Sequence, residues 1–77
     1  MDYYELITEI KTKLEAAGFH SDADEITENQ MILGTPGESF SSVCHFFRHS
    51  SFQQSSAFKT VEPQVRSLLK YATSIGY

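Results

Sequence analysis

Residues 34–49 read Gly-Thr-Pro-Gly-Glu-Ser-Phe-Ser-Ser-Val-Cys-His-Phe-Phe-Arg-His, and this stretch decides the fold class. Thr35 is a good N-cap residue, Pro36 suits the first helical position, and Glu38 completes the capping pattern. After this start, apolar side chains recur at intervals of three and four residues, as on one face of a helix: Phe40, Val43, Cys44 and Phe47. The pattern predicts a helix that runs to about His49.

The start of the chain predicts another amphipathic helix, from about Asp2 to Ala17. Asp2 can cap its first turn, with Glu5 three residues further along. Gly18 follows the last apolar position and predicts a left-handed stop. The apolar stripe of this helix consists of Tyr3, Leu6, Ile7, Ile10, Leu14 and Ala17.

A further helix is predicted between these two, from Ser21 to Leu33. Ser21 and Asp24 give its start signal, and acidic residues in a first turn complement the helix dipole. Gly34 is expected to end it. Its weak apolar face contains Ala23, Ile26, Gln30 and Leu33.

Residues 50–59 contain four serines and two glutamines and are interpreted as a long loop. Phe52 and Phe58 within it are expected to fold back onto the core. A last helix is predicted to start near Thr60, with Pro63 in its first turn, where a missing N–H costs little. Its stripe consists of Val61, Val65, Leu68, Leu69, Ala72 and Ile75, and Gly76 is expected to end it.

These elements predict an all-α fold, a small antiparallel four-helix bundle in which residues 1–77 form a single helical domain. No useful stretch alternates with period two, and no internal repeat is found. The chain has 77 residues, of which 40% are hydrophobic, so it can form one thin core. Six phenylalanines and four tyrosines argue against disorder.

Charge is distributed unevenly along the chain, whose formal net charge is −4. Residues 1–38 carry nine acidic and two basic residues, whereas residues 39–77 carry one acidic and four basic residues. The acidic half could attract a basic partner, or the two halves could attract each other across the fold. The scattered basic residues do not form a phosphate-binding patch, so no nucleic-acid partner is expected.

Three patterns that could carry chemistry have simpler interpretations. His45 and His49, four residues apart, could chelate a metal, but two polar histidines on the outer flank of a helix are the simpler reading. Cys44 and His45 are neighbours that point about 100° apart in a helix, so they cannot pair as nucleophile and base. Residues 34–39 lack the Gly-Lys-Ser/Thr ending of a phosphate loop. We therefore expect no catalytic residue, metal or cofactor.

The acidic residues around the start of the second helix are the candidate partner-binding site. They lack the alternating ligands and central glycine of a calcium loop. They could complement the helix dipole alone, or they could form a docking patch for a basic partner. The candidate partner-binding residues are Glu9, Asp22, Asp24, Glu25 and Glu28. The aromatic group of Phe46, Phe47, Phe52 and Phe58 is interpreted as core rather than as an exposed anchor.

The compartment is expected to be the cytoplasm. No apolar run approaches the roughly 18 residues that a membrane span needs, so no membrane association is expected. The first residues lack the basic and apolar regions of a signal peptide. The single cysteine excludes an intramolecular disulfide and suits a reducing compartment.

The second half of the chain resembles small helical immunity proteins that accompany secreted or contact-delivered bacterial toxins, including Maf-type immunity proteins. The resemblance covers roughly residues 30–77. The residues that carry it are Leu33 to Glu38, Phe40, the Val43-Cys44 step, Phe47 and the ending Ile75-Gly76-Tyr77. It implies a cytosolic protein that binds and neutralises a cognate toxin, often a basic nuclease, without any catalytic residue of its own.

The function expected from the sequence is that of a non-enzymatic protein-binding module, an immunity or inhibitor protein that neutralises a basic toxin through an acidic face. One alternative is a small structural protein that associates with itself as a homodimer. Another is a metal protein or enzyme that uses His45, His49 and His20.

Overall fold

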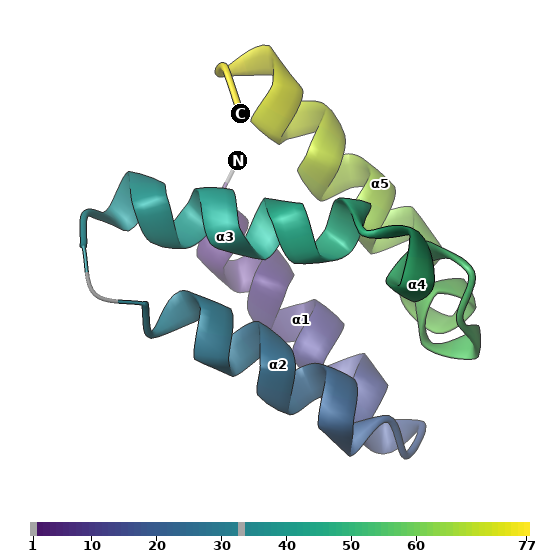
Figure 1. The fold of residues 1–77 in the computed structure, drawn as a ribbon. Helices are drawn as coiled ribbons and strands as arrows, with labels where there is room; N and C mark the ends of the chain where they lie inside the picture. Colours follow the sequence, from purple (N-terminus) through teal and green to yellow (C-terminus); the bar gives the residue numbers. More distant parts are fainter. Residues whose placement is uncertain (1, 33) are drawn as a thin grey trace.

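The computed structural model describes residues 2–32 and 34–77, which form five helices (Figure 1). These are α1 (Tyr3–Ala16), α2 (His20–Gln30), α3 (Pro36–Arg48), α4 (Ser50–Gln53) and α5 (Ser56–Ser74). No strand occurs in the described ranges, so the all-α fold is confirmed. The four-helix antiparallel bundle is not confirmed, because the short α4 adds a fifth helix.

The most extensive packing joins α1 to α2, α2 to α3 and α5 to α1, and α3 also contacts α5. The short α4 lies between the end of α3 and the start of α5 and touches both (Figure 1). The start of α1 and the end of α5 lie near one another, because the ring centroids of Tyr3 and Tyr71 are 6.3 Å apart.

Both ends of α1 are as predicted. The Asp2 carboxylate accepts hydrogen bonds from the backbone N–H groups of Tyr4 at 3.0 Å and Glu5 at 3.2 Å. Gly18 adopts φ +89°, which favours glycine. The N–H of the residue after Gly18 donates to the Leu14 carbonyl oxygen at 2.8 Å, the bond of a Schellman ending. This ending turns the chain directly into α2.

The prediction for α2 was wrong at its start. The helix begins at His20, and Phe19 precedes it without any side-chain cap hydrogen bond. The Schellman turn at the end of α1 sets the entry instead, so Ser21 and Asp24 lie inside the helix.

The predicted end of α2 differs as well. The helix stops at Gln30, and the predicted last residue, Leu33, lies outside the described residues. The Ile32 carbonyl oxygen accepts a hydrogen bond from Ser39 Oγ of α3 at 3.2 Å. This contact ties Ile32 to the start of α3.

The helix that decides the fold class forms as predicted. Thr35 is the N-cap of α3, and its hydroxyl oxygen accepts from the Glu38 N–H at 3.2 Å. Pro36 is the first residue of the helix, which ends at Arg48. All four residues of its predicted stripe are buried: Phe40, Val43, Cys44 and Phe47.

The interpretation of residues 50–59 as a loop was wrong. His49 caps α4, because its Nδ1 accepts from the Ser51 N–H at 3.2 Å. Ser55 caps α5 through a 3.2 Å bond from the Phe58 N–H to its hydroxyl oxygen. Ser55, one of the polar residues that indicated a loop, therefore serves as a helix cap. Consequently Pro63 lies in the interior of α5, not in its first turn.

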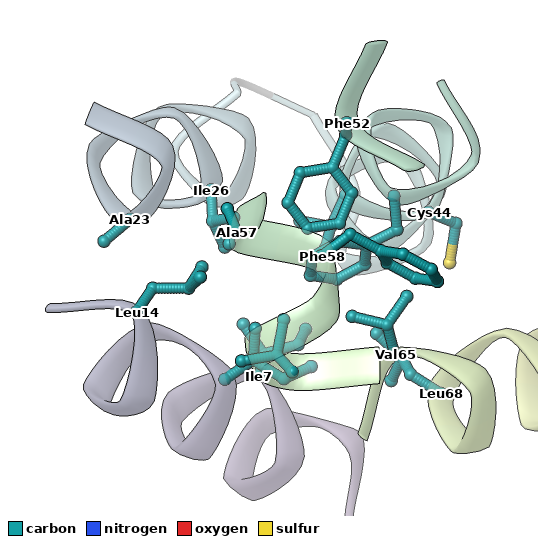
Figure 2. Packing of buried hydrophobic residues seen from close by; sticks show 14 of the residues in the cluster. Ile7, Leu14, Ala23, Ile26, Cys44, Phe52, Ala57, Phe58, Val65 and Leu68 are labelled. Atoms are coloured by element: carbon teal, nitrogen blue, oxygen red, sulfur yellow. The ribbon is translucent and has the colours of Figure 1, made fainter. Parts of the chain in front are cut away.

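The core receives buried side chains from all five helices (Figure 2). Phe52 is 4% exposed and Phe58 is buried beside it, so the expectation that both fold back onto the core is confirmed. Phe46 is half-buried and packs against Phe52. Ile75, expected in the stripe of the last helix, is 46% exposed.

Candidate functional site

Four of the five candidate binding residues lie on α2, and we call Asp22, Asp24, Glu25 and Glu28 the acidic face. Asp24, Glu25 and Glu28 are exposed, and Asp22 is half-buried. The helix turns Ala23 and Ile26 into the core, which directs the carboxylates away from it. The local spacing of three and four residues thus gathers negative charge on the outer side of one helix.

No carboxylate of the acidic face takes part in an ion pair with any residue that the structure describes. The ion pair that the described residues do form lies within α5, where Arg66 Nε is 2.7 Å from a carboxylate oxygen of Glu62. Lys11 of α1 reaches α2, yet its Nζ donates to Gln30 Oε1 at 2.7 Å and to Thr27 Oγ1 at 3.3 Å. Within the described ranges, no ion pair therefore joins the acidic and basic halves of the chain.

The fifth candidate residue, Glu9, lies on a different part of the surface. It borders an open hollow together with Glu5 of α1 and Ser67 of α5. Lys11, two residues further along α1 and about 200° around the helix, hydrogen-bonds to α2. The structure thus groups Glu9 with the α1–α5 side of the molecule.

His45 lies on α3, whereas His49 follows its last residue in an extended conformation, so the two do not share one side of a helix as their spacing predicted. Their ring centroids are 6.5 Å apart, and both border a hollow of about 280 Å³ with Glu25 and Phe46. His49 Nδ1 is already engaged as the cap of α4. Among residues 2–32 and 34–77, no group of three or more His, Cys, Asp or Glu side chains is placed to hold a metal ion.

Cys44 lies in the core, separated from the exposed His45. Burial raises the pKa of the Cys44 thiol, and the nearby Arg48 opposes this shift. Burial therefore disfavours the thiolate, which is the form of cysteine that acts as a nucleophile.

One feature that sequence analysis missed is a gathering of all four tyrosines of the chain at one end of the molecule. Tyr3 packs on Phe40 in a tilted arrangement with ring centroids 4.2 Å apart, and Tyr77 meets Phe40 edge-on at 5.4 Å. Tyr4 and Tyr71 complete the group, within 4.4 and 6.3 Å of Tyr3. We call this group the tyrosine end. A signal was present in the sequence, because two tyrosines open α1 and two lie at or after the last turns of α5.

Contacts between helices hold the tyrosine end together. Arg48 of α3 donates from Nη1 to the Tyr77 carbonyl oxygen at 2.6 Å. The Tyr77 hydroxyl lies against Gly37, where a larger side chain would meet it. The pKa of Tyr3 is raised from 10.0 to about 12 by its hydrogen bond with the Tyr4 side chain, by burial and by the neighbouring tyrosines.

A hollow of about 210 Å³ opens between the start of α1, the end of α2 and the start of α3. Tyr4, Gln30, Gly34 and Pro36 are among its lining residues. Tyr4 is 52% exposed, while Met31 and Ile32, directly after α2, are 73% and 45% exposed. This end of the molecule therefore combines a hollow with exposed apolar surface.

No protein-family model matches the chain, and neither the curated proteins nor the solved structures contain a match. In the part of the chain that the structure describes, no helix has the length and apolar character needed to cross a membrane.

Proposed function

We propose that the chain is a non-enzymatic protein-binding domain whose acidic face docks on a basic surface of another protein. The observation that carries this proposal is the state of Asp24, Glu25 and Glu28. All three are exposed, and none is paired with a cation among the described residues. Their charge is therefore available to a partner.

Electrostatics determines what such a face does. Exposed carboxylates speed the encounter with a basic surface and orient it, although each pair formed at a rim contributes only about 0–1 kcal/mol. Lys and Arg side chains of the partner are the groups that would meet Glu25 and Glu28. A partner that uses those cations to hold its own anionic substrate would be blocked.

The resemblance to immunity proteins gives this proposal its specific form. The partner would be a basic bacterial toxin, neutralised in the cytoplasm of the cell that makes the inhibitor. The burial of Cys44 in the core and the use of His49 as a helix cap support a binding role over a catalytic one.

A charge-matched comparison tests the proposal. The immobilised domain captures partners from a lysate of its source at low and moderate salt, and mass spectrometry identifies them. The test variant is Glu25→Gln/Glu28→Gln, and the control Glu15→Gln/Glu62→Gln changes the net charge equally elsewhere. We expect the wild type and the control variant to capture one basic protein, which is released as the salt concentration rises. The test variant is expected not to retain this protein. Equal capture by both variants, or capture of no basic protein, would contradict the proposal.

A second candidate function is self-association, which the exposed apolar surface of Tyr4, Met31 and Ile32 favours. Light scattering across a range of protein concentrations distinguishes it, because a homodimer would double the mass and a one-to-one inhibitor would stay monomeric alone.

A further inference from the structure

A hollow between α2, α3 and α4 is bordered by a residue of the acidic face. That residue is Glu25, and the rings of Phe46 on α3 and Phe52 on α4 border the same hollow. Asn29, one turn after Glu25, is fixed at the α2 side. Its amide nitrogen donates to the Glu25 backbone carbonyl oxygen at 2.8 Å, and its amide oxygen accepts from the Ser42 hydroxyl at 2.5 Å. A carboxylate and aromatic rings therefore meet at one cavity of about 280 Å³.

This hollow combines an aromatic wall with hydrogen-bond acceptors. The ring centroids of Phe46 and Phe52 are 4.9 Å apart, and Phe46 is only half-buried, so part of the wall is open to a guest. The Glu25 carboxylate is exposed and forms no ion pair with a described residue. The His45 imidazole adds a ring nitrogen, which accepts hydrogen bonds in the neutral form. Carboxylates and aromatic ring faces both attract cations, so this lining suits a cationic guest rich in N–H donors.

The chain itself shows how a carboxylate and a phenyl ring hold a cation together. On α5, Arg66 Nε lies 2.7 Å from a carboxylate oxygen of Glu62. The guanidinium carbon of the same arginine lies 5.8 Å from the centre of the Phe58 ring. One guanidinium thus meets both groups at once. Glu25 and Phe46 bring the same two groups to the hollow.

The chain does not supply a cation of its own to this hollow. Among the residues that the structure describes, no Lys or Arg lines it. Arg48 is close in sequence, but it donates to the Tyr77 carbonyl oxygen at 2.6 Å and to the Thr73 hydroxyl at 3.4 Å. The Lys11 ammonium, which reaches α2 from α1, is held by Gln30 at 2.7 Å. A cation that fits the lining would therefore come from another protein.

We propose that this hollow receives an arginine side chain of the basic partner, whose guanidinium pairs with the Glu25 carboxylate and packs on the Phe46 ring. This inference rests on the proposed function and names the side chain that the acidic face recognises. Arginine fits better than lysine, because a planar guanidinium stacks on a ring while its forked N–H groups meet a carboxylate. The volume of about 280 Å³ is below the ~300–1,000 Å³ of pockets that enclose a whole small ligand, as expected for one side chain.

A library of random dodecapeptides displayed on phage provides a defined probe. The library is selected on the immobilised domain at about pH 8, where histidine side chains are ordinarily uncharged. A synthetic copy of the most enriched peptide is then titrated against variants. We expect enriched peptides to share an arginine whose replacement by lysine raises the Kd roughly threefold to tenfold. Phe46→Leu, which keeps an apolar side chain without the ring, is expected to raise the Kd of the arginine peptide by a similar factor and to abolish its advantage over the lysine peptide.

Matched variants separate the hollow from its surroundings. Phe46→Tyr keeps the ring, so its Kd is expected to change less than about twofold. Glu25→Gln is expected to raise the Kd about tenfold, the effect of losing a hydrogen bond between charged groups. Glu28→Gln removes an exposed carboxylate of the acidic face that does not line the hollow, and is expected to raise the Kd less than about threefold. Circular dichroism verifies that each variant is folded, and if Phe46→Leu does not fold, the two glutamine variants decide.

Failure of the inference and failure of the proposed function give different results. The arginine contact is overturned if no peptide is enriched, if Phe46→Leu weakens the arginine and lysine peptides equally, or if Glu25→Gln and Glu28→Gln have equal effects. The acidic face then still stands if Glu25→Gln/Glu28→Gln loses the basic protein captured from the lysate. Enriched peptides without Lys or Arg, bound equally by Glu25→Gln/Glu28→Gln, would overturn the arginine contact and the proposed function together.

Discussion

At the scale of the residue, Tyr3 reports most directly on the packing of the tyrosine end. Its raised pKa means that the neutral phenol is favoured in the folded chain. The stability gained in this way is complete below pH 10 and is lost as the pH rises from 10.0 toward 12, because the unfolded chain loses its proton first. In a titration of phenolate absorbance we expect one late tyrosine, which Tyr3→Phe removes. Four tyrosines that titrate together near their ordinary pKa would contradict this packing.

Gly18 is the residue whose backbone conformation allows α1 to turn into α2. At φ +89° a Cβ meets no neighbouring atom, so only the left-handed backbone penalises a larger residue. We expect Gly18→Ala to lower the free energy of unfolding by about 1 kcal/mol, and Gly18→Asn to lower it less, since asparagine tolerates this region. Urea denaturation measures both. An alanine variant as stable as the wild type would argue against the Schellman ending.

At the scale of the element, α4 depends on tertiary contacts rather than on its own propensity. Four residues are too few to form a helix alone. Its Phe52 ring lies 4.9 Å from Phe46 and 5.7 Å from Phe58 between ring centroids. We expect Phe52→Ala to reduce the free energy of unfolding by about 3–5 kcal/mol and Phe52→Leu by less. Gln54→Ala, at an exposed position beside it, is the control for chemical denaturation. Equal stability of Phe52→Ala and Gln54→Ala would contradict the role of Phe52.

The helices differ in how well their starting residues can be predicted from the sequence. Asp2 and Thr35 cap α1 and α3 through bonds to residues two or three positions away, so a local pattern predicts them. The entry to α2 depends on the backbone ending of α1, and α4 depends on where Phe52 packs. Those contacts are not local, which explains why the serine-rich stretch looked like a loop.

At the scale of the whole molecule, the distinction between local and long-range contacts also separates the acidic face from Glu9 and the tyrosine end. The acidic face lies on one helix, so its carboxylates could be grouped from their spacing. Glu9 could not be placed from sequence, because its position depends on how α1 packs against α5. The tyrosine end requires the start of α1 and the end of α5 to meet, and only the assembled fold brings Tyr3 and Tyr71 within 6.3 Å.

The central claim is that the acidic face guides a basic protein onto this domain. The most direct test is the association rate constant with the captured partner, measured for the wild type and Glu25→Gln/Glu28→Gln at salt concentrations of about 20 and 200 mM, which differ strongly in screening. We expect fast association that slows steeply with salt for the wild type, and slower association with a shallower salt dependence for the variant. Identical rate constants and salt dependences for the two proteins would contradict it.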